Sequence, residues 1–247
     1  MNPKVIAHRG ARKIAPENTI EAFKLSLEAG CDGIEFDVHR CSTGQLVVIH
    51  DDQVNRTTNG VGFVKEISWG ELQRLDAGSW FDSQFALARI PSLRQVLDLV
   101  KGSVVLNIEI KNAPTDYPDI EEDLVAELEG YPLETVIVSS FDHKFLRRLS
   151  KLNPTLNLAV LADVVFEDVV GYVRNLNAKY WHPGFGELRA AEVEEAHTGG
   201  LLVNTWTINE QRGWASAIKM NVDGIVTDDP RGLVQYLHAI QAASARV

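Results

Sequence analysis

The chain has 247 residues, 45% of them hydrophobic and 23% charged, which excludes fibrous and disordered classes of protein. Twenty-four Lys and Arg against thirty-four Asp and Glu give a net charge of −10, so the surface repels nucleic acid and anionic lipid, and neither is expected as a partner. No apolar stretch approaches the length of about 18 residues that a membrane helix needs. The first residues show neither a hydrophobic leader nor a cleavage site, so we expect a cytoplasmic protein without a stable membrane anchor.

Short apolar segments of strand character alternate with amphipathic stretches along the chain. Strands are predicted at 5–8, 33–38, 46–50, 104–110, 135–139, 156–161, 178–182, 200–205 and 223–226. Helical periodicity predicts helices near 20–27, 92–100, 119–129, 142–152, 166–176, 187–197, 209–219 and 230–243, with Asp142, Asn209 and Asp229 as N-caps. With 46–50 treated as an extension of the second strand, eight strand–helix units remain. This α/β pattern favours one (β/α)8 TIM barrel over residues 1–247.

Residues 52–91 interrupt this alternation. Their periodicity is weak, and they are rich in turn-forming and aromatic residues. We expect a small insertion after the second strand, over the C-terminal mouth of the barrel, because long loops in compact domains are usually functional. Cys31 and Cys41 are separated by mostly extended chain beyond the reach of a disulfide, so both are expected to be reduced.

Acidic side chains occupy one face of two predicted strands. Alternation places Glu35 and Asp37 together, opposite an apolar face, and it places Glu109 and Lys111 together on another strand. In a barrel the apolar face meets the helices, so these polar groups would lie inside, near the C-terminal mouth, where barrel enzymes keep their active sites. Buried carboxylates need compensation, and three of them with one lysine are not self-neutralising. A hard divalent cation with oxygen ligands would balance the charge, and Arg9 would leave the pocket positive enough for a phosphodiester.

Two histidines end predicted strands that lead to the same mouth. His8 and His50 are therefore candidates for proton transfer near neutral pH. His39 shares the parity of the acidic residues but lies beyond the strand, so we assign it a supporting place. His182 also ends a strand, but no partner for it can be recognised in the sequence. The remaining histidines lie on or beside predicted helices and are expected to be structural.

Together these residues resemble the glycerophosphodiester phosphodiesterase family over nearly the whole chain. Each motif alone is weak, but their order and spacing make the set specific. The motifs are His8-Arg9-Gly10, Pro16-Glu17-Asn18-Thr19, Glu35-Phe36-Asp37-Val38, His50-Asp51, Arg56-Thr57-Thr58, Leu75-Asp76-Ala77-Gly78, Ile90-Pro91-Ser92-Leu93, Glu109-Ile110-Lys111, Ser139-Ser140-Phe141, Asn204-Thr205-Trp206-Thr207 and Asp223-Gly224-Ile225-Val226-Thr227-Asp228.

The resemblance implies a TIM barrel that hydrolyses a small glycerophosphodiester to glycerol 3-phosphate and an alcohol, and it implies roles for individual residues. One divalent cation, Mg²⁺ or Ca²⁺, would be held by Glu35, Asp37 and Glu109. The acid/base pair would be His8 and His50. The phosphate would contact Arg9 and Lys111, the glycerol pocket would be lined by Phe141 and Trp206, and supporting residues would be Glu17 and Asn18.

Several alternatives stay open at this point. The nucleophile is either water or the neighbouring glycerol hydroxyl, which would give a cyclic phosphate. The same scaffold could act on lysophospholipids as a phospholipase D, with residues 52–91 forming an apolar lid. A non-catalytic barrel that binds phosphodiesters is a further reading, and metal-dependent lyase or amide chemistry is supported by the fold class alone.

Overall fold

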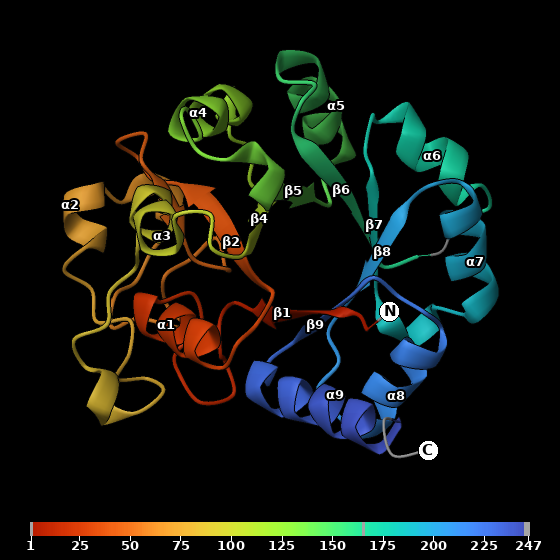
Figure 1. Ribbon diagram of the computed structural model, residues 1–247. Coiled ribbons are helices and arrows are strands. Elements are labelled where there is room, and N and C mark those ends of the chain that lie inside the picture. Colours follow the sequence, from red (N-terminus) through yellow and green to blue (C-terminus); the bar gives the residue numbers. More distant parts are fainter. Residues whose placement is uncertain (1, 165, 245–247) are drawn as a thin grey trace.

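The computed structural model describes residues 2–164 and 166–244 and shows a closed barrel of parallel strands (Figure 1). The sheet order is β1-β9-β8-β7-β6-β5-β4-β2-β3, and β1 also pairs with β2, which closes the ring. The predicted TIM barrel is therefore confirmed. Its parallel strands are β1 (Lys4–His8), β2 (Gly33–Arg40), β4 (Val105–Ile110), β5 (Val136–Ser140), β6 (Asn157–Ala162), β7 (Tyr180–Pro183), β8 (Leu202–Thr205) and β9 (Gly224–Thr227).

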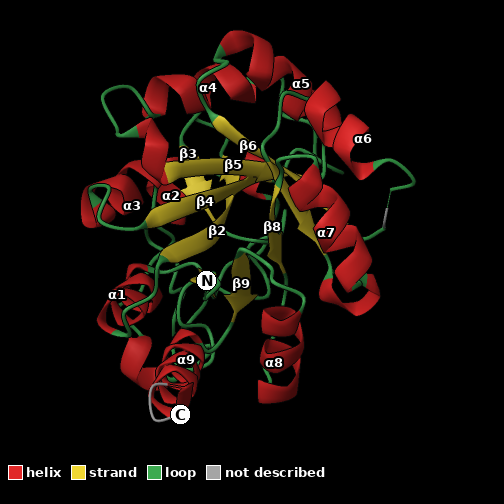
Figure 2. Ribbon diagram, turned by 45° about the vertical axis from the view of Figure 1, so that its right-hand side comes forward, coloured by secondary structure: helices red, strands yellow, loops and turns green. Residues whose placement is uncertain are grey.

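Helices surround the strands on the outside of the barrel (Figure 2). They are α1 (Ile20–Glu28), α3 (Leu93–Val100), α4 (Ile120–Glu127), α5 (His143–Leu152), α6 (Val169–Asn175), α7 (Ala190–Thr198), α8 (Gln211–Lys219) and α9 (Pro230–Ser244). Single 3-10 turns, Leu133–Thr135 and Phe185–Glu187, precede β5 and α7. The main core lies between strands and helices: Ile34, Phe36 and Val38 of β2 are fully buried there. The intervening Glu35 and Asp37 consequently face the barrel interior.

A ninth strand stands outside the parallel ring. β3 (Leu46–Val48) pairs antiparallel with β2, with Val48 opposite Val38, so the 46–50 segment returns along the second strand as a hairpin. The chain then forms a 3-10 turn (Val64–Glu66), α2 (Trp69–Leu72) and a second 3-10 turn (Ser83–Phe85).

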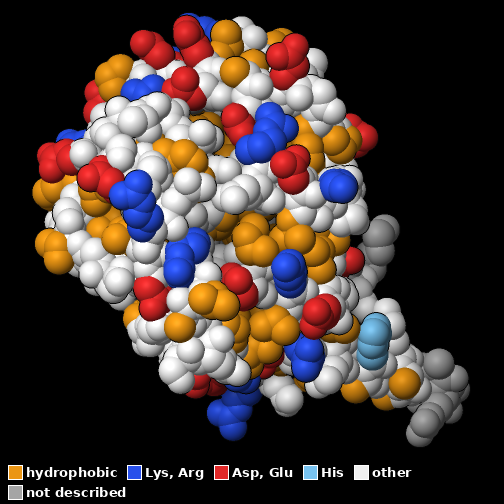
Figure 3. Space-filling model, turned by 90° about the vertical axis from the view of Figure 1, so that its left-hand side faces the viewer, with side chains coloured by type: hydrophobic (Ala, Val, Ile, Leu, Met, Phe, Trp, Pro, Cys, Tyr) orange, Lys and Arg blue, Asp and Glu red, His pale blue; other side chains and the backbone are white. Residues whose placement is uncertain are grey.

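Residues 52–91 contribute to a second, smaller core. It is built by Cys41, Val47, Ile49, Val54, Val64, Leu72, Ala77 and Ile90. The segment lies at the left of Figure 1, while α4 to α9 follow the upper, right and lower sides. Figure 3 shows this left face, where acidic, basic and hydrophobic side chains are interspersed, so the negative net charge is not concentrated over the insertion.

The predicted helix starts are partly confirmed. Asp142 caps α5 by accepting hydrogen bonds from the backbone N–H groups of Lys144 and Phe145. Asn209 was expected to cap α8, and this prediction is wrong: the N-cap is Glu210, and the Asn209 side chain instead binds Asp228. Asn209 therefore binds Asp228, at the barrel mouth, instead of capping the helix.

Two further sequence expectations concern cysteine chemistry and membranes. Cys31 and Cys41 are both free and buried. Within 2–164 and 166–244, none of the helices combines the length and the apolar character needed to span a bilayer.

Candidate active site

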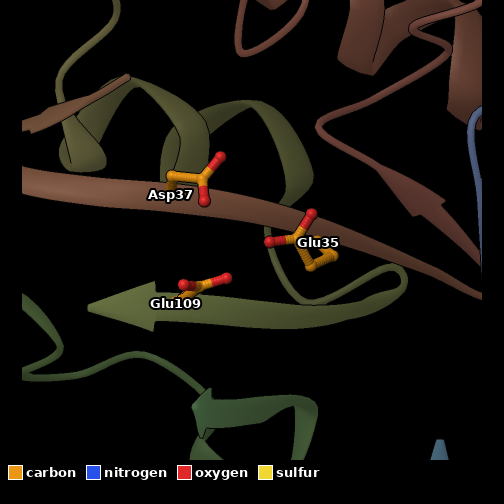
Figure 4. A group of neighbouring side chains, drawn as sticks. All are labelled: Glu35, Asp37 and Glu109. Atoms are coloured by element: carbon orange, nitrogen blue, oxygen red, sulfur yellow. The ribbon is translucent and has the colours of Figure 1, made fainter. Parts of the chain in front are cut away.

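Three carboxylates converge inside the barrel between β2 and β4. The register places Asp37 beside Glu109, and Glu35 precedes Asp37 by two residues on the same face of β2. One oxygen from each of the three side chains lies within 4.8 Å of the others, and all three residues are buried (Figure 4). The juxtaposition expected from strand alternation is thus present.

Two basic side chains accompany the acidic triad. Lys111 Nζ lies 3.0 Å from Asp37 Oδ1 and also donates a hydrogen bond to Glu109. Arg9 Nε lies 3.2 Å from Asp37 Oδ2, while the Arg9 backbone N–H donates to Glu35 Oε2 at 3.0 Å. Both cations therefore contact the triad directly from the ends of β1 and β4.

Burial and mutual repulsion separate the pKa values of the three carboxylates. Burial, with repulsion from Asp37 and Glu109, raises the pKa of Glu35 well above its usual range. Burial also raises the pKa of Glu109 to about 7, despite attraction by Lys111. For Asp37 burial acts in the same direction, but Lys111 and Arg9 outweigh it and lower the pKa. The cluster by itself holds one firm negative charge at Asp37, while burial and repulsion disfavour the ionised forms of Glu35 and Glu109.

Each of the two candidate histidines is held by its own aspartate. His8 Nδ1 lies 2.6 Å from Asp228 Oδ1, and His50 Nδ1 lies 2.6 Å from Asp51 Oδ1. A carboxylate at Nδ1 keeps the proton on that nitrogen and leaves Nε2 available for proton exchange. Burial lowers the pKa of both imidazoles. His39 supports this arrangement, because its Nε2 donates to the His50 backbone carbonyl at 3.0 Å.

A pocket of about 270 Å³ joins these groups. Its lining includes His8, Arg9, Glu35, His50, Asn107, Glu109, Lys111, Phe141, Asp163, His182 and Trp206. A second cavity, of about 420 Å³, opens at the opposite end of the barrel, where β1, β4, β7 and β8 begin, and none of the predicted site residues lines it. The mouth at the carboxyl ends of the strands is therefore where the candidate chemistry gathers.

Two aromatic rings form one wall of the pocket. Phe141 follows β5 and Trp206 follows β8, and their ring centroids are 5.8 Å apart with perpendicular planes. Trp206 Nε1 donates to the His182 carbonyl at 2.9 Å, which fixes the indole. His182, for which no partner can be recognised in the sequence, has one in the structure: the Asn204 side chain lies 3.0 Å from His182 Nε2 in the barrel interior.

The loop between β1 and α1 brings Glu17 and Asn18 behind the pocket wall. Asn18 Nδ2 donates to Asp37 Oδ2 at 2.8 Å, and its backbone N–H donates to the Arg9 carbonyl at 3.0 Å. Arg9 and Asn18 both adopt positive φ, 53° and 58°. Such a conformation costs about 1–3 kcal/mol for a residue other than glycine and tends to cluster at functional sites. The loop is thus held in a strained shape that places Arg9 against the triad.

Comparison with known proteins decides which group of barrels this chain resembles. The model of the glycerophosphoryl diester phosphodiesterase family matches residues 8–231. The chain belongs to the glycerophosphoryl diester phosphodiesterase family. A relative from Caldanaerobacter subterraneus subsp. tengcongensis, named glycerophosphodiester phosphodiesterase, is 42% identical over 236 residues, which are 95% of this chain and 97% of the relative. A Bacillus altitudinis relative of the same name is 40% identical over 92% of this chain and 95% of its own length.

A solved structure supports the same membership at the level of the fold. A phosphodiesterase from Oleispira antarctica, in complex with the product sn-glycerol-3-phosphate, matches with a TM-score of 0.89 at 26% identity, over 96% of this chain and 97% of that chain. The resemblance stated from the sequence motifs is therefore confirmed.

Several residues around this pocket were not predicted as site residues. Asp51 directly follows His50 in the sequence, a signal that was available, whereas Asp228 reaches His8 only through closure of the barrel. Hydrogen bonds from Arg56 lower the pKa of Asp51 to about 2, so this carboxylate stays ionised beside the imidazole. Arg12 and Arg56 lie in loops without periodicity, which gives no indication of their direction.

Proposed function

We propose that the protein hydrolyses glycerophosphodiesters to glycerol 3-phosphate and an alcohol, by acid/base catalysis with two histidines at a cation site. The observation that carries this proposal is that two histidines, each paired with an aspartate, line one pocket together with Arg9, Lys111 and the carboxylates Glu35 and Glu109. Membership of the family and the relatives named glycerophosphodiester phosphodiesterase support the enzyme class, a phosphoric diester hydrolase.

Glu35, Asp37 and Glu109 fit a divalent cation. One buried acceptor in this region, Asn107 Oδ1, accepts no hydrogen bond from any described residue, while Asp37 Oδ1 is paired with Lys111. Carboxylate and amide oxygens are the ligands that Mg²⁺ and Ca²⁺ prefer, so we propose one of these two ions as the cation. When bound, it would stabilise negative charge on the phosphoryl oxygens. The three carboxylates would hold it, and Lys111 would remain beside Asp37 to balance the remaining charge.

Arg9 and Lys111 would bind the phosphate, and the aromatic wall would bind the glycerol. Both basic groups line the pocket while contacting the triad, so a phosphodiester there meets positive charge on two sides. Phe141 and Trp206 present apolar surface to the carbon atoms of the glycerol, as in most small-molecule sites.

His8 and His50 would act from opposite sides of the phosphorus. One neutral imidazole takes a proton from the nucleophile through Nε2, and the other, protonated, gives a proton to the departing alkoxide. Asp228 and Asp51 favour the imidazolium form at each Nδ1 and hold the ring orientation. The nucleophile is water or the adjacent glycerol hydroxyl, and trapping a cyclic phosphate under single-turnover conditions would establish the second route.

A product assay tests the proposal. Purified protein is incubated with glycerophosphocholine, and glycerol 3-phosphate is measured with Mg²⁺, Ca²⁺ or excess chelator. We expect product with a divalent ion and its loss with chelator, restored by added ion. Full activity in excess chelator would contradict the cation site. A parallel assay with lysophosphatidylcholine separates the lysophospholipase D alternative, and no product from any diester would favour a non-catalytic barrel.

A cytoplasmic location stays a prediction.

A further inference from the structure

One buried carboxylate, Glu17, is shared by three arginines. Its side chain is 1% exposed. Arg9 Nη1 and Arg56 Nη2 donate to Glu17 Oε1 at 2.9 Å and 2.8 Å, and Arg12 Nε lies 3.0 Å from Oε2. A single carboxylate rarely needs three cations for its own neutralisation, and each of these arginines also contacts a second carboxylate: Asp37, Asp228 and Asp51 for Arg9, Arg12 and Arg56 respectively.

Arg56 connects Glu17 to His50. Its Nε donates to Asp51 Oδ2 at 2.7 Å and its Nη2 to Asp51 Oδ1 at 3.0 Å, while Nη1 and Nη2 contact Glu17. Asp51 Oδ1 in turn accepts from His50 Nδ1. The planar guanidinium therefore fixes the plane of the Asp51 carboxylate, and that carboxylate sets the direction of the imidazole.

Arg12 connects Glu17 to His8 on the other side. Arg12 Nη1 lies 3.7 Å from Asp228 Oδ1, the same oxygen that binds His8 Nδ1. This second connection is looser than the first, but Asp228 has an additional support: Asn209 Nδ2 donates to Asp228 Oδ2 at 2.8 Å. Both histidines are thus connected to Glu17, each through an Arg–Asp pair, and the pair on the His50 side is the tighter one.

We propose that Glu17 is a positioning residue that orients both acid/base histidines, His50 through Arg56 and Asp51, and His8 through Arg12 and Asp228. The inference deepens the proposed function and rests on it. Because a buried carboxylate bound by several guanidinium groups has little freedom, one group sets the angle between two imidazoles that must act on opposite sides of one phosphorus. Asn209 makes the His8 side less dependent on Glu17 than the His50 side.

Proton NMR of the imidazole Nδ1–H groups tests this in the protein without substrate. A ring N–H bonded to a carboxylate gives a low-field signal that exchanges slowly with water, and His8→Gln and His50→Gln distinguish the signals of these two rings from that of His197, which is bonded to Asp223. We expect Glu17→Gln to broaden the His50 signal while the His8 signal persists. Adding Asn209→Ala should then remove the His8 signal as well. A sharp, unchanged His50 signal in Glu17→Gln would overturn the proposal, as would the absence of both signals from the wild type.

Two further variants guard against simple misfolding. Arg56→Lys keeps the charge at a half-exposed position but cannot bridge two carboxylates, so it should affect the His50 signal alone. If Arg56→Lys leaves that signal unchanged, the connection is refuted even where Glu17→Gln fails to fold. The matched control is Glu121→Gln, which removes another buried carboxylate bound by an arginine, Arg148, and should leave both signals unchanged.

Kinetics provide a second readout that a purely structural role would not give. Glu17→Gln should lower kcat by about 10- to 100-fold, as loss of a supporting contact does elsewhere, with little change in KM. In a His50→Gln background, Glu17→Gln should lower kcat much less, because the histidine through which Glu17 mainly acts is already absent. Equal losses in both backgrounds would overturn the coupling. An inactive wild type would refute the proposed function, while the NMR result would still decide the role of Glu17.

Discussion

At the scale of single residues, the site depends on imidazoles whose Nδ1 atoms are already occupied. His8 and His50 each bind an aspartate through Nδ1 at 2.6 Å, and both line the pocket. A third His–Asp pair, His197 with Asp223 at 2.8 Å, lies at the opposite end of the barrel. An aspartate partner therefore does not distinguish His8 and His50 from His197, whereas the cavity that each of them lines does.

Replacing either pocket histidine should abolish most turnover while preserving the fold. We expect His8→Gln and His50→Gln each to lower kcat by about 10²–10⁴, since one proton transfer loses its carrier. His197→Gln removes a comparable pair remote from the pocket and should leave kcat unchanged. Steady-state release of glycerol 3-phosphate measures all three variants, with circular dichroism as the control for folding. Activity of His50→Gln within tenfold of the wild type would remove it from the proposed role.

A different histidine should set part of the pH dependence of stability. Burial lowers the pKa of His182 to about 3 in the folded protein, against an ordinary value of 6.5. Between these values the unfolded chain binds the extra proton, so the free energy of unfolding should fall as pH is lowered below 6.5. The expected slope from this group is at most about 1.4 kcal/mol per pH unit.

Urea unfolding of wild type and His182→Gln between pH 7 and pH 5 measures this effect. Glutamine can still accept from Asn204 but does not titrate, so the variant should lose less stability on acidification. Parallel curves for the two proteins would show that His182 is protonated in the folded state.

Residue placement could be predicted from the sequence where strand geometry controls it. Period-two alternation put Glu35 and Asp37 on one face of one strand and Glu109 on the corresponding face of another, and the structure brings the three together. The roles assigned to them stay predictions. The contacts of Arg56 and Asp228 could not be predicted, because they follow from where two loops and the closing strand meet in space.

At the scale of elements, the β1–α1 loop places more site residues than any regular element. It contributes Arg9, Glu17 and Asn18, and its tight path begins at Gly10, with φ of 86°. A Cβ at Gly10 would lie 2.7 Å from Ala22 Cβ and 2.8 Å from the Ala22 backbone carbon. Helix α1 therefore packs against bare backbone at this point, which fixes the loop against the helix.

Gly10→Ala should thus destabilise the protein more than Gly44→Ala. Both glycines have positive φ, so alanine costs about 1–2 kcal/mol at either position. Only Gly10 adds a steric clash, worth about 1–3 kcal/mol, because no atom lies within 4 Å of a Cβ at Gly44. Urea denaturation compares the two variants, and activity should fall only in Gly10→Ala, since the clash displaces Arg9. Equal destabilisation would contradict the packing argument.

Elements of the barrel were predictable because amphipathic helices and apolar strands repeat over many residues. The insertion was visible only as a break in that repetition. Its helix α2 has four residues and its 3-10 turns have three, too short for a periodic signal. What holds it is the small core around Leu72 and Val54, which forms only when the segment meets the β2–β3 hairpin.

At the scale of the whole molecule, the barrel encloses carboxylates that repel one another. Burial raises the pKa of Glu35 and Glu109, so keeping either carboxylate ionised costs free energy in the folded state. The two residues lie on different strands, and both strands share this cost. Occupation of the triad by a divalent ion should therefore stabilise the entire fold, because the unfolded chain has no such arrangement.

Thermal unfolding with Mg²⁺ or Ca²⁺ measures that stabilisation. At about one hundred times the dissociation constant, the ion should add about 2.7 kcal/mol to the free energy of unfolding. Glu109→Gln should lose most of this increment, and K⁺ at equal ionic strength should not produce it. An identical shift in Glu109→Gln would indicate that the ion binds elsewhere.

The closure of the barrel also has a consequence for synthesis on the ribosome. β1 is held between β2 and β9, so one edge of β1 stays unpaired until β9 has been synthesised. The acidic triad is complete once Glu109 has emerged, whereas Asp228, the partner of His8, follows more than a hundred residues later. A nascent chain therefore presents its candidate ion-binding groups and both candidate acid/base histidines before Asp228, which holds the His8 ring, has been synthesised.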